Sequence, residues 1–162
     1  MCRLGVIRMT NDPELVFPVV EDIVRRIGRR CPVETRQAMH LSLVEMTMNA
    51  IEHGNLAIGS DTKGLTLQDG SFEDLVESRR RQEPYASRCV LIEYHLEPHR
   101  VLFTIRDEGV GFDWRAQQAL SMQGPASPLH GRGILIARAK MDACVFEPKG
   151  NAVTLVKYYE TI

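Results

Sequence analysis

The sequence has 162 residues, of which 44% are hydrophobic and 25% are charged, and its formal net charge at pH 7 is −1. This length and composition are those of one globular domain with a hydrophobic core. The near-zero charge argues against a surface for nucleic acid or anionic lipid, because both attract basic proteins. The sequence contains no run of about 18 apolar residues and no apolar N-terminal signal core. We therefore expect a cytoplasmic protein.

The cysteines Cys2, Cys31, Cys89 and Cys144 lie far apart in the sequence. None forms a C-x-x-C pair, and no histidine stands at zinc-site spacing from a cysteine. In a cytoplasmic compartment we expect reduced, mostly buried thiols. Nothing in the sequence supports a cysteine nucleophile.

The chain begins with a predicted strand and a predicted helix. Residues 4–9 read as the strand, and Asp12 and Pro13 suit the N-cap and first turn of the helix. Apolar residues at three- and four-residue steps extend this helix to about Gly28. Pro18 either kinks the helix or marks its true start. We expect the apolar stripe to pack on a sheet, with part of it free to face a second subunit.

A second helix is predicted after the break at Cys31 and Pro32. It runs over residues 33–53, and Gly54 is its stop. The predicted core stripe of this helix consists of Ala38, Leu41, Val44, Met48 and Ile51.

The segment 56–87 is less regular. Phe72, Leu75 and Val76 predict a short amphipathic helix that ends in three arginines, 79–81. We interpret the arginine run as a solvated helix end, the alternative being contact with a partner or a phosphate.

The remaining chain predicts two hairpins and one helix. Residues 88–96 and 101–106 form the first hairpin, residues 133–141 the helix, and residues 144–146 and 152–159 the second hairpin. The order strand, two helices, hairpin, helix, hairpin predicts an α/β (α+β) two-layer sandwich. Its mostly antiparallel sheet is covered on one face by helices.

Glu45, Asn49 and His53 stand four residues apart, on one stripe of the second predicted helix. One reading of this stripe is a face of capped or paired polar residues. The functional reading needs two different groups. The Asn49 oxygen is a hard ligand suited to Mg²⁺, and Glu45 can deprotonate a hydroxyl that attacks a γ-phosphate. We leave His53 out of the chemistry, as a lid or helix-end contact.

Asp107 follows the predicted strand 101–106 and opens the pattern D-x-G-x-G. A carboxylate at a strand end can accept a hydrogen bond from the exocyclic amine of adenine. Gly109 and Gly111 let the backbone pass close to a ligand without a clash of Cβ atoms. The same pattern also occurs in plain turns.

Gly131, Arg132 and Gly133 open the third predicted helix. The amides and dipole of a helix start favour a phosphate there, and Arg132 either adds charge-assisted bonds or faces solvent. Residues 113–130 before it are expected to be a mobile loop with a short helix around 114–120, and the glycines suit a lid hinge. Neither a Walker P-loop nor a Rossmann fingerprint is present.

Taken together, these segments resemble the N box and the two glycine boxes of the GHKL ATPases, which share the Bergerat fold. The resemblance covers nearly the whole chain and is greatest to the anti-sigma-factor serine/threonine kinase branch. The stretches that carry it are EMTMNAIEHGN, DEGVGFDW, HGRGILIARAKMD and GNAVTLVKY. The insertion, with EPYASRCV, resembles that of related ATP-binding modules that are sometimes fused to receiver or phosphatase domains.

The resemblance implies a role for each matching residue. Glu45 would be the general base and Asn49 the Mg²⁺ ligand. Asp107 would read adenine, helped by Gly109 and Gly111.

It also implies that residues 1–162 form one histidine kinase-like ATPase domain, with an insertion at 56–87 and an ATP lid at 113–130. Gly131 to Gly133 would lie at the triphosphate, and Thr154 would support the adenine through water.

In that family the partners are STAS-type anti-anti-sigma proteins and, in some members, a sigma factor, and homodimers are common. We therefore expect a Mg-ATP-dependent serine/threonine kinase that acts on a STAS partner. One alternative is an ATP-binding partner-switching module with little or no kinase activity. Another is an ATP-sensing output domain recognised by a receiver or phosphatase protein. We expect no nucleic-acid or membrane partner.

Overall fold

The computed structural model describes residues 3–28, 31–116 and 132–160. Its strands form an antiparallel sheet in the order β1-β2-β3-β5-β4. The strands are β1 (Arg3–Met9), β2 (Val90–Leu96), β3 (Arg100–Arg106), β4 (Ala143–Phe146) and β5 (Ala152–Tyr158).

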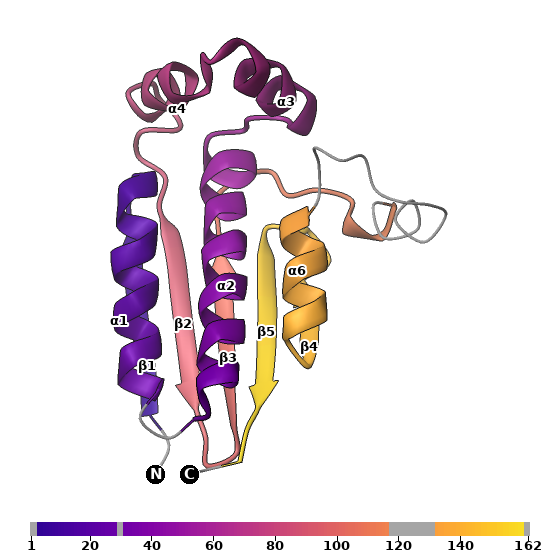
Figure 1. Ribbon diagram of the computed structural model, residues 1–162. Coiled ribbons are helices and arrows are strands. Elements are labelled where there is room, and N and C mark those ends of the chain that lie inside the picture. The colour runs from indigo at the N-terminus through magenta and orange to yellow at the C-terminus, as the bar shows by residue number, and fades with distance from the viewer. Residues whose placement is uncertain (1–2, 29–30, 117–131, 161–162) are drawn as a thin grey trace.

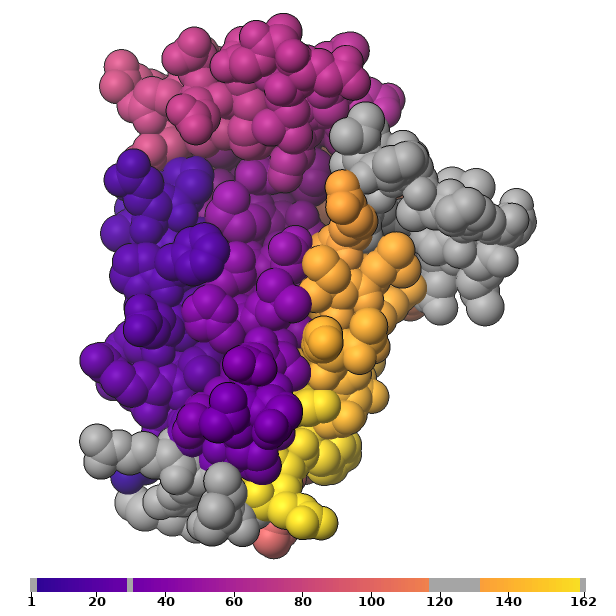
Figure 2. All heavy atoms as spheres, viewed as in Figure 1, coloured from indigo at the N-terminus to yellow at the C-terminus, as the bar shows by residue number. Residues whose placement is uncertain are grey.

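Three helices lie side by side on one face of this sheet (Figures 1 and 2). They are α1 (Val16–Gly28), α2 (Val33–Asn49) and α6 (Arg132–Lys140). The core lies between the two layers, where Phe103 and Leu155 of the sheet are fully buried together with Ile23 and Leu43 of the helices. The predicted two-layer α+β sandwich is therefore confirmed.

The start of α1 shows what Pro18 does. A 3₁₀ turn, η1 (Pro13–Leu15), precedes the helix, and the Asp12 carboxylate accepts a hydrogen bond of 3.1 Å from the Glu14 N–H. Pro18 then lies in the first turn of α1, where its missing N–H costs no helical hydrogen bond. It marks the helix start. The predicted stripe packs on the sheet through Val16, Val20, Ile23, Val24 and Ile27.

The core stripe predicted for α2 is partly wrong. Val44 is buried, but Leu41 is 38% exposed. The helix lies between α1 and α6 with the sheet beneath it (Figure 1), so it is covered on three sides and no single stripe describes its buried surface. Its buried residues are Met39, Ser42, Leu43, Val44, Met46 and Thr47.

Gly54 does not stop the second helix as predicted. The chain passes from α2 directly into a π-helical turn, η2 (Ala50–Asn55), which ends as the Leu56 N–H donates to the Ile51 carbonyl at 2.8 Å. Such wide turns are rare and often occur at functional sites.

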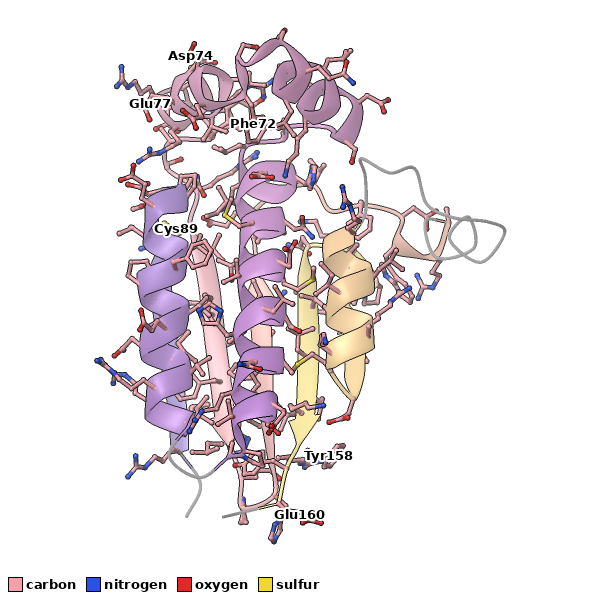
Figure 3. The ribbon with its side chains drawn as sticks, in the orientation of Figure 1. Phe72, Asp74, Glu77, Cys89, Tyr158 and Glu160 are labelled. Atoms are coloured by element: carbon pink, nitrogen blue, oxygen red, sulfur yellow. The ribbon has the colours of Figure 1, made fainter. Side chains whose placement is uncertain are left out.

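Two short helices, α3 (Ser60–Asp69) and α4 (Phe72–Arg80), cover one end of the sandwich (Figure 1). The sequence predicted α4 and missed α3. Figure 3 shows Asp74 and Glu77 of α4 at the outside of this cap. No helix among the described residues is both long and apolar enough to cross a membrane.

The arginine run joins the cap to the rest of the protein. Arg80 contacts Asp12 at 3.0 Å and Glu77 at 2.9 Å, and Arg81 contacts Glu77 at 2.6 Å. Arg79 donates to the Leu56 carbonyl at 3.1 Å. The run therefore has structural contacts beyond those of a solvated helix end.

Candidate nucleotide site

The Glu45 and Asn49 side chains lie one turn apart on α2, half-buried and next to the start of α6. A Cβ atom placed on Gly133 would lie 2.8 Å from Glu45 Oε2 and 3.0 Å from Asn49 Nδ2. In the part of the chain that the structure describes, no hydrogen bond or ion pair engages either side chain. The two groups are thus held together beside a helix start and are free to bind a ligand.

The donor set at this position fits a magnesium ion that arrives with phosphates. Residues 3–28, 31–116 and 132–160 contain no group of three His, Cys, Asp or Glu side chains that could hold a metal. Asn49 offers a single hard oxygen. Mg²⁺ usually takes one or two protein ligands and completes its shell with phosphates and waters, so this site suits a metal–nucleotide complex.

Asp107 lies directly after β3 and is 9% exposed. It packs on η2, where a Cβ atom on Gly54 would lie 2.3 Å from Asp107 Cγ. Burial raises the pKa of Asp107 to about 6, against the opposing effects of the Gly109 N–H bond and of Lys149, Arg88 and Arg106. The carboxylate is ionised at pH 7 and can accept a hydrogen bond from an amine of a ligand.

The glycine turn after Asp107 is packed closely against other parts of the chain. A Cβ atom on Gly109 would lie 2.4 Å from the Gly54 carbonyl oxygen. Gly111 has a φ of +79°, and a Cβ atom there would lie 1.9 Å from the Lys149 carbonyl oxygen. The space at these glycines is filled by the chain itself. They allow the turn to pack against η2 and the β4–β5 turn, which is a different requirement from approach to a ligand.

The first residues of the predicted lid are fixed to the β4–β5 turn. The Trp114 indole donates to the Glu147 carbonyl at 3.0 Å, and the Phe112 ring meets the Phe146 ring edge-on at 5.3 Å. Arg106 pairs with the Glu147 carboxylate. The short helix predicted at 114–120 is present at its beginning, and the rest of the lid prediction, from residue 117 on, lies outside the described residues.

Thr154 lies on the other face of the sheet. It stands opposite Thr104 in the β3–β5 ladder, and the two hydroxyl oxygens are 3.2 Å apart. The neighbouring pair, Phe103 and Leu155, is fully buried under the helices. Since successive strand residues point to opposite faces, the structure does not bring Thr154 together with Asp107.

The third predicted segment is only partly described. Gly131 lies outside the described residues, Arg132 is the exposed first residue of α6, and Gly133 is buried against α2. His53 Nδ1 lies 2.6 Å from the Ile58 carbonyl oxygen. Because a carbonyl oxygen only accepts, this nitrogen carries the proton. His53 therefore makes a contact at the helix end, as predicted.

Two buried asparagines next to this site were missed. Asn55 is fully buried and accepts from the Glu108 N–H at 2.8 Å, and Asn151 donates to the Asp107 carbonyl at 2.9 Å. Asn55 directly follows the Glu45–Gly54 segment, and Asn151 lies in the turn before β5. Their contacts join residues far apart in the sequence, so only their polar character near two motifs could have signalled them.

A surface hollow of the described chain lies away from these residues. It runs between α1 and α2 and is lined by Glu21, Val24, Gly28, Val33, Arg36 and His40. It shares no residue with the predicted nucleotide site. Residues 117–131, which precede Arg132 in the sequence, lie outside the described residues.

The sandwich, the polar pair beside a helix start and the buried aspartate after a strand together describe a nucleotide-binding domain. The family model of the histidine kinase-like ATPase domain matches residues 9–157. The chain therefore belongs to this GHKL-type family, which supports ATP as its ligand. The match does not distinguish the anti-sigma kinase branch. A comparison with curated proteins found no match.

Proposed function

We propose that the protein is a Mg-ATP-dependent serine/threonine kinase of the anti-sigma type that phosphorylates a STAS-type anti-anti-sigma partner. The main support is the placement of Glu45 and Asn49, one helical turn apart and in close approach to Gly133 at the start of α6. A base and a magnesium ligand at one helix start are what phosphoryl transfer to a hydroxyl needs.

We assign the other end of the site to the base of the nucleotide. The Asp107 carboxylate would accept a hydrogen bond from the exocyclic amine of adenine. Gly54, beneath Asp107, follows Glu45 by nine steps along α2 and η2, which is at most about 14 Å at the α-helical rise of 1.5 Å per residue. An elongated ligand fits this spacing, with its base at Asp107 and its phosphates near Arg132 and Gly133.

The proposed reaction uses the side chains as follows. Glu45 accepts the proton of a serine or threonine hydroxyl, while the oxygen of that hydroxyl attacks the γ-phosphorus. The bond between that phosphorus and the bridging oxygen breaks, and ADP leaves. Asn49 would hold Mg²⁺ through its amide oxygen, and the ion would neutralise charge on the phosphates. We assign Arg132, the exposed first residue of α6, to contact with the same phosphates.

The test is phosphate transfer from radiolabelled ATP to a panel of STAS-domain proteins from the same organism. Glu45→Gln is expected to lower the transfer rate by about 10² to 10⁴-fold, the usual contribution of a general base, while ATP binding is retained. Glu34→Gln, at an exposed glutamate in the first turn of the same helix, is the matched control and should transfer normally.

Two results would contradict the kinase assignment. One is a wild-type protein that binds ATP and transfers phosphate to none of the STAS proteins. The other is a Glu45→Gln variant as active as the wild type. The first would favour a partner-switching module that binds ATP without transfer, or an output domain controlled by a receiver or phosphatase protein.

A further inference from the structure

The two peptide groups that flank Asp107 are both held by buried asparagines. The Asp107 N–H donates to the Asn151 carbonyl at 2.9 Å, and the Asn151 side chain donates back to the Asp107 carbonyl at 2.9 Å. The Glu108 N–H, which belongs to the same peptide group as the Asp107 carbonyl, donates to Asn55 Oδ1 at 2.8 Å. The backbone around the carboxylate is therefore fixed before and after its Cα atom.

The orientation of the Asn55 amide is itself determined by further contacts. The Asn11 side chain donates to the carbonyls of Tyr85 and Arg88, at 2.8 and 3.1 Å. Carbonyls only accept, so Asn11 must turn its own oxygen toward Asn55, which donates to it at 2.7 Å. Asn55 must then turn its oxygen toward Glu108. Because backbone groups stand at both ends of this series of hydrogen bonds, each of the two amides has only one possible orientation.

Burial makes these contacts costly to lose. Asn55 is fully buried, while Asn11 is 4% and Asn151 9% exposed. A buried amide without partners is unfavourable, so a network of this kind either forms completely or destabilises the fold. The network also includes the segment between α4 and β2, because Arg88 of this segment donates to the Asn55 carbonyl at 2.7 Å.

We propose that Asn55 and Asn151 are positioning residues for Asp107, which they hold at the place where it recognises the amine of adenine. The inference deepens the proposed function and depends on its assignment of Asp107. Neither asparagine need touch the nucleotide. Each acts on the peptide groups that set where the Asp107 carboxylate stands, so each should affect recognition of the amine and little else of the ligand.

The experiment compares calorimetric binding of ATP with that of purine riboside triphosphate, which lacks the exocyclic amine. The wild type is expected to prefer ATP about tenfold or more, the usual effect of a hydrogen bond to a charged group. Asn55→Ala and Asn151→Ala should bind ATP nearly as weakly as the analogue and bind the analogue as the wild type does. Asp107→Ala is the reference for complete loss of preference.

If the two asparagines had a merely structural role, their variants would bind ATP and the analogue more weakly to the same extent. Ile23→Val, at a fully buried residue of α1, controls for lost stability and should keep the preference for ATP over the analogue. If Asn55→Ala does not fold, Asn151→Ala decides the matter, because it removes a single bond to the Asp107 carbonyl. A wild-type preference that survives in Asn151→Ala would overturn the inference. A wild type that binds ATP without preferring it would overturn the adenine assignment of Asp107, and the inference with it.

Discussion

At Asp107, burial and ionisation work against each other. The folded-state pKa of about 6 lies above the ordinary 3.8, so the native state binds this proton more tightly than the unfolded state does. The stability of the wild type therefore falls, relative to a neutral variant, as the pH rises from about 4 through 6. The carboxylate is kept at a cost to the fold, which suits a residue retained for a ligand.

Asp107→Asn is expected to be more stable than the wild type at pH 7.5. The amide keeps an acceptor for the Gly109 N–H, and a shift of this size corresponds to at most about 3 kcal/mol. Urea unfolding at pH 7.5 and pH 4 measures the gain, which should largely vanish at the lower pH. Asp74→Asn, at an exposed carboxylate, is the control. A variant no more stable than the wild type at pH 7.5 would contradict this account of Asp107.

At Gly133, the absent side chain has a clear consequence. The Cβ of Gly133→Ala would press on Glu45 Oε2 and Asn49 Nδ2, while alanine favours a helix by about 1 kcal/mol over glycine. We expect unchanged stability and at least tenfold weaker Mg-dependent ATP binding by calorimetry. Gly59→Ala is the control, because nothing lies within 4 Å of a Cβ atom there. Equal ATP affinity in both variants would show that Gly133 does not border the site.

The sequence could single out Glu45, Asn49 and Asp107 as candidate site residues because each belongs to a local motif. Which face Thr154 occupies depends on the register of β3 and β5, which a single strand pattern does not reveal. The same limit applies to Gly109. That glycine is required by a contact with η2, a segment far away in the sequence.

Among the elements, the α3–α4 cap is joined to η2 by a buried ion pair. Glu52 is 2% exposed and contacts Lys63, whose side chain is 29% exposed. The Lys63 ammonium also lies 5.4 Å from the centre of the Phe72 ring, which Figure 3 shows on α4. Few other contacts attach α3, so this pair is important for its position.

Lys63→Met should destabilise the protein by about 2–4 kcal/mol, because it leaves the Glu52 carboxylate buried without its partner. Adding Glu52→Gln to Lys63→Met should restore most of that loss. Chemical denaturation measures both changes. Arg25→Ala breaks the exposed pair with Asp22 and should leave the stability nearly unchanged. A similarly small effect of Lys63→Met would mean that the pair does not hold the cap.

The elements themselves were predictable where their pattern is amphipathic. Strand alternation and the stripe of α1 gave the sheet and one helix of its cover. In contrast, α3 buries only Gly64, and its leucines at 65 and 67 are 66% and 53% exposed. A helix without an apolar face has no periodic signal, so α3 was missed.

For the molecule as a whole, the second face of the sheet is the main uncovered surface of the described chain. Leu4 and Val6 of β1 are 73% and 56% exposed there, and Val145 of β4 is 59% exposed. Four strands of seven residues and one of four, at about 4.8 Å spacing and about 3.3 Å per residue, present roughly 500 Å². Two such faces would bury about 1,000 Å², enough for a specific interface. We propose that a second copy of the chain packs there.

Leu4→Lys is expected to weaken self-association at least tenfold, since it replaces an exposed apolar side chain of the proposed interface by a charged one. Sedimentation velocity over a range of concentrations measures the change. Leu65→Lys is the matched control, because Leu65 is 66% exposed on the cap, away from this face. A wild type that stays monomeric throughout, or equal loss in both variants, would contradict the dimer.

Calorimetric binding of ATP, with and without Mg²⁺, to the wild type, Asp107→Ala and Asn49→Ala decides whether these residues form a nucleotide site. The wild type should bind with higher affinity when Mg²⁺ is present. Asp107→Ala should weaken binding at least tenfold, and Asn49→Ala should remove most of the effect of Mg²⁺. A well-folded wild type that binds no ATP, or variants that bind as the wild type does, would contradict the assignment of these residues to a nucleotide site.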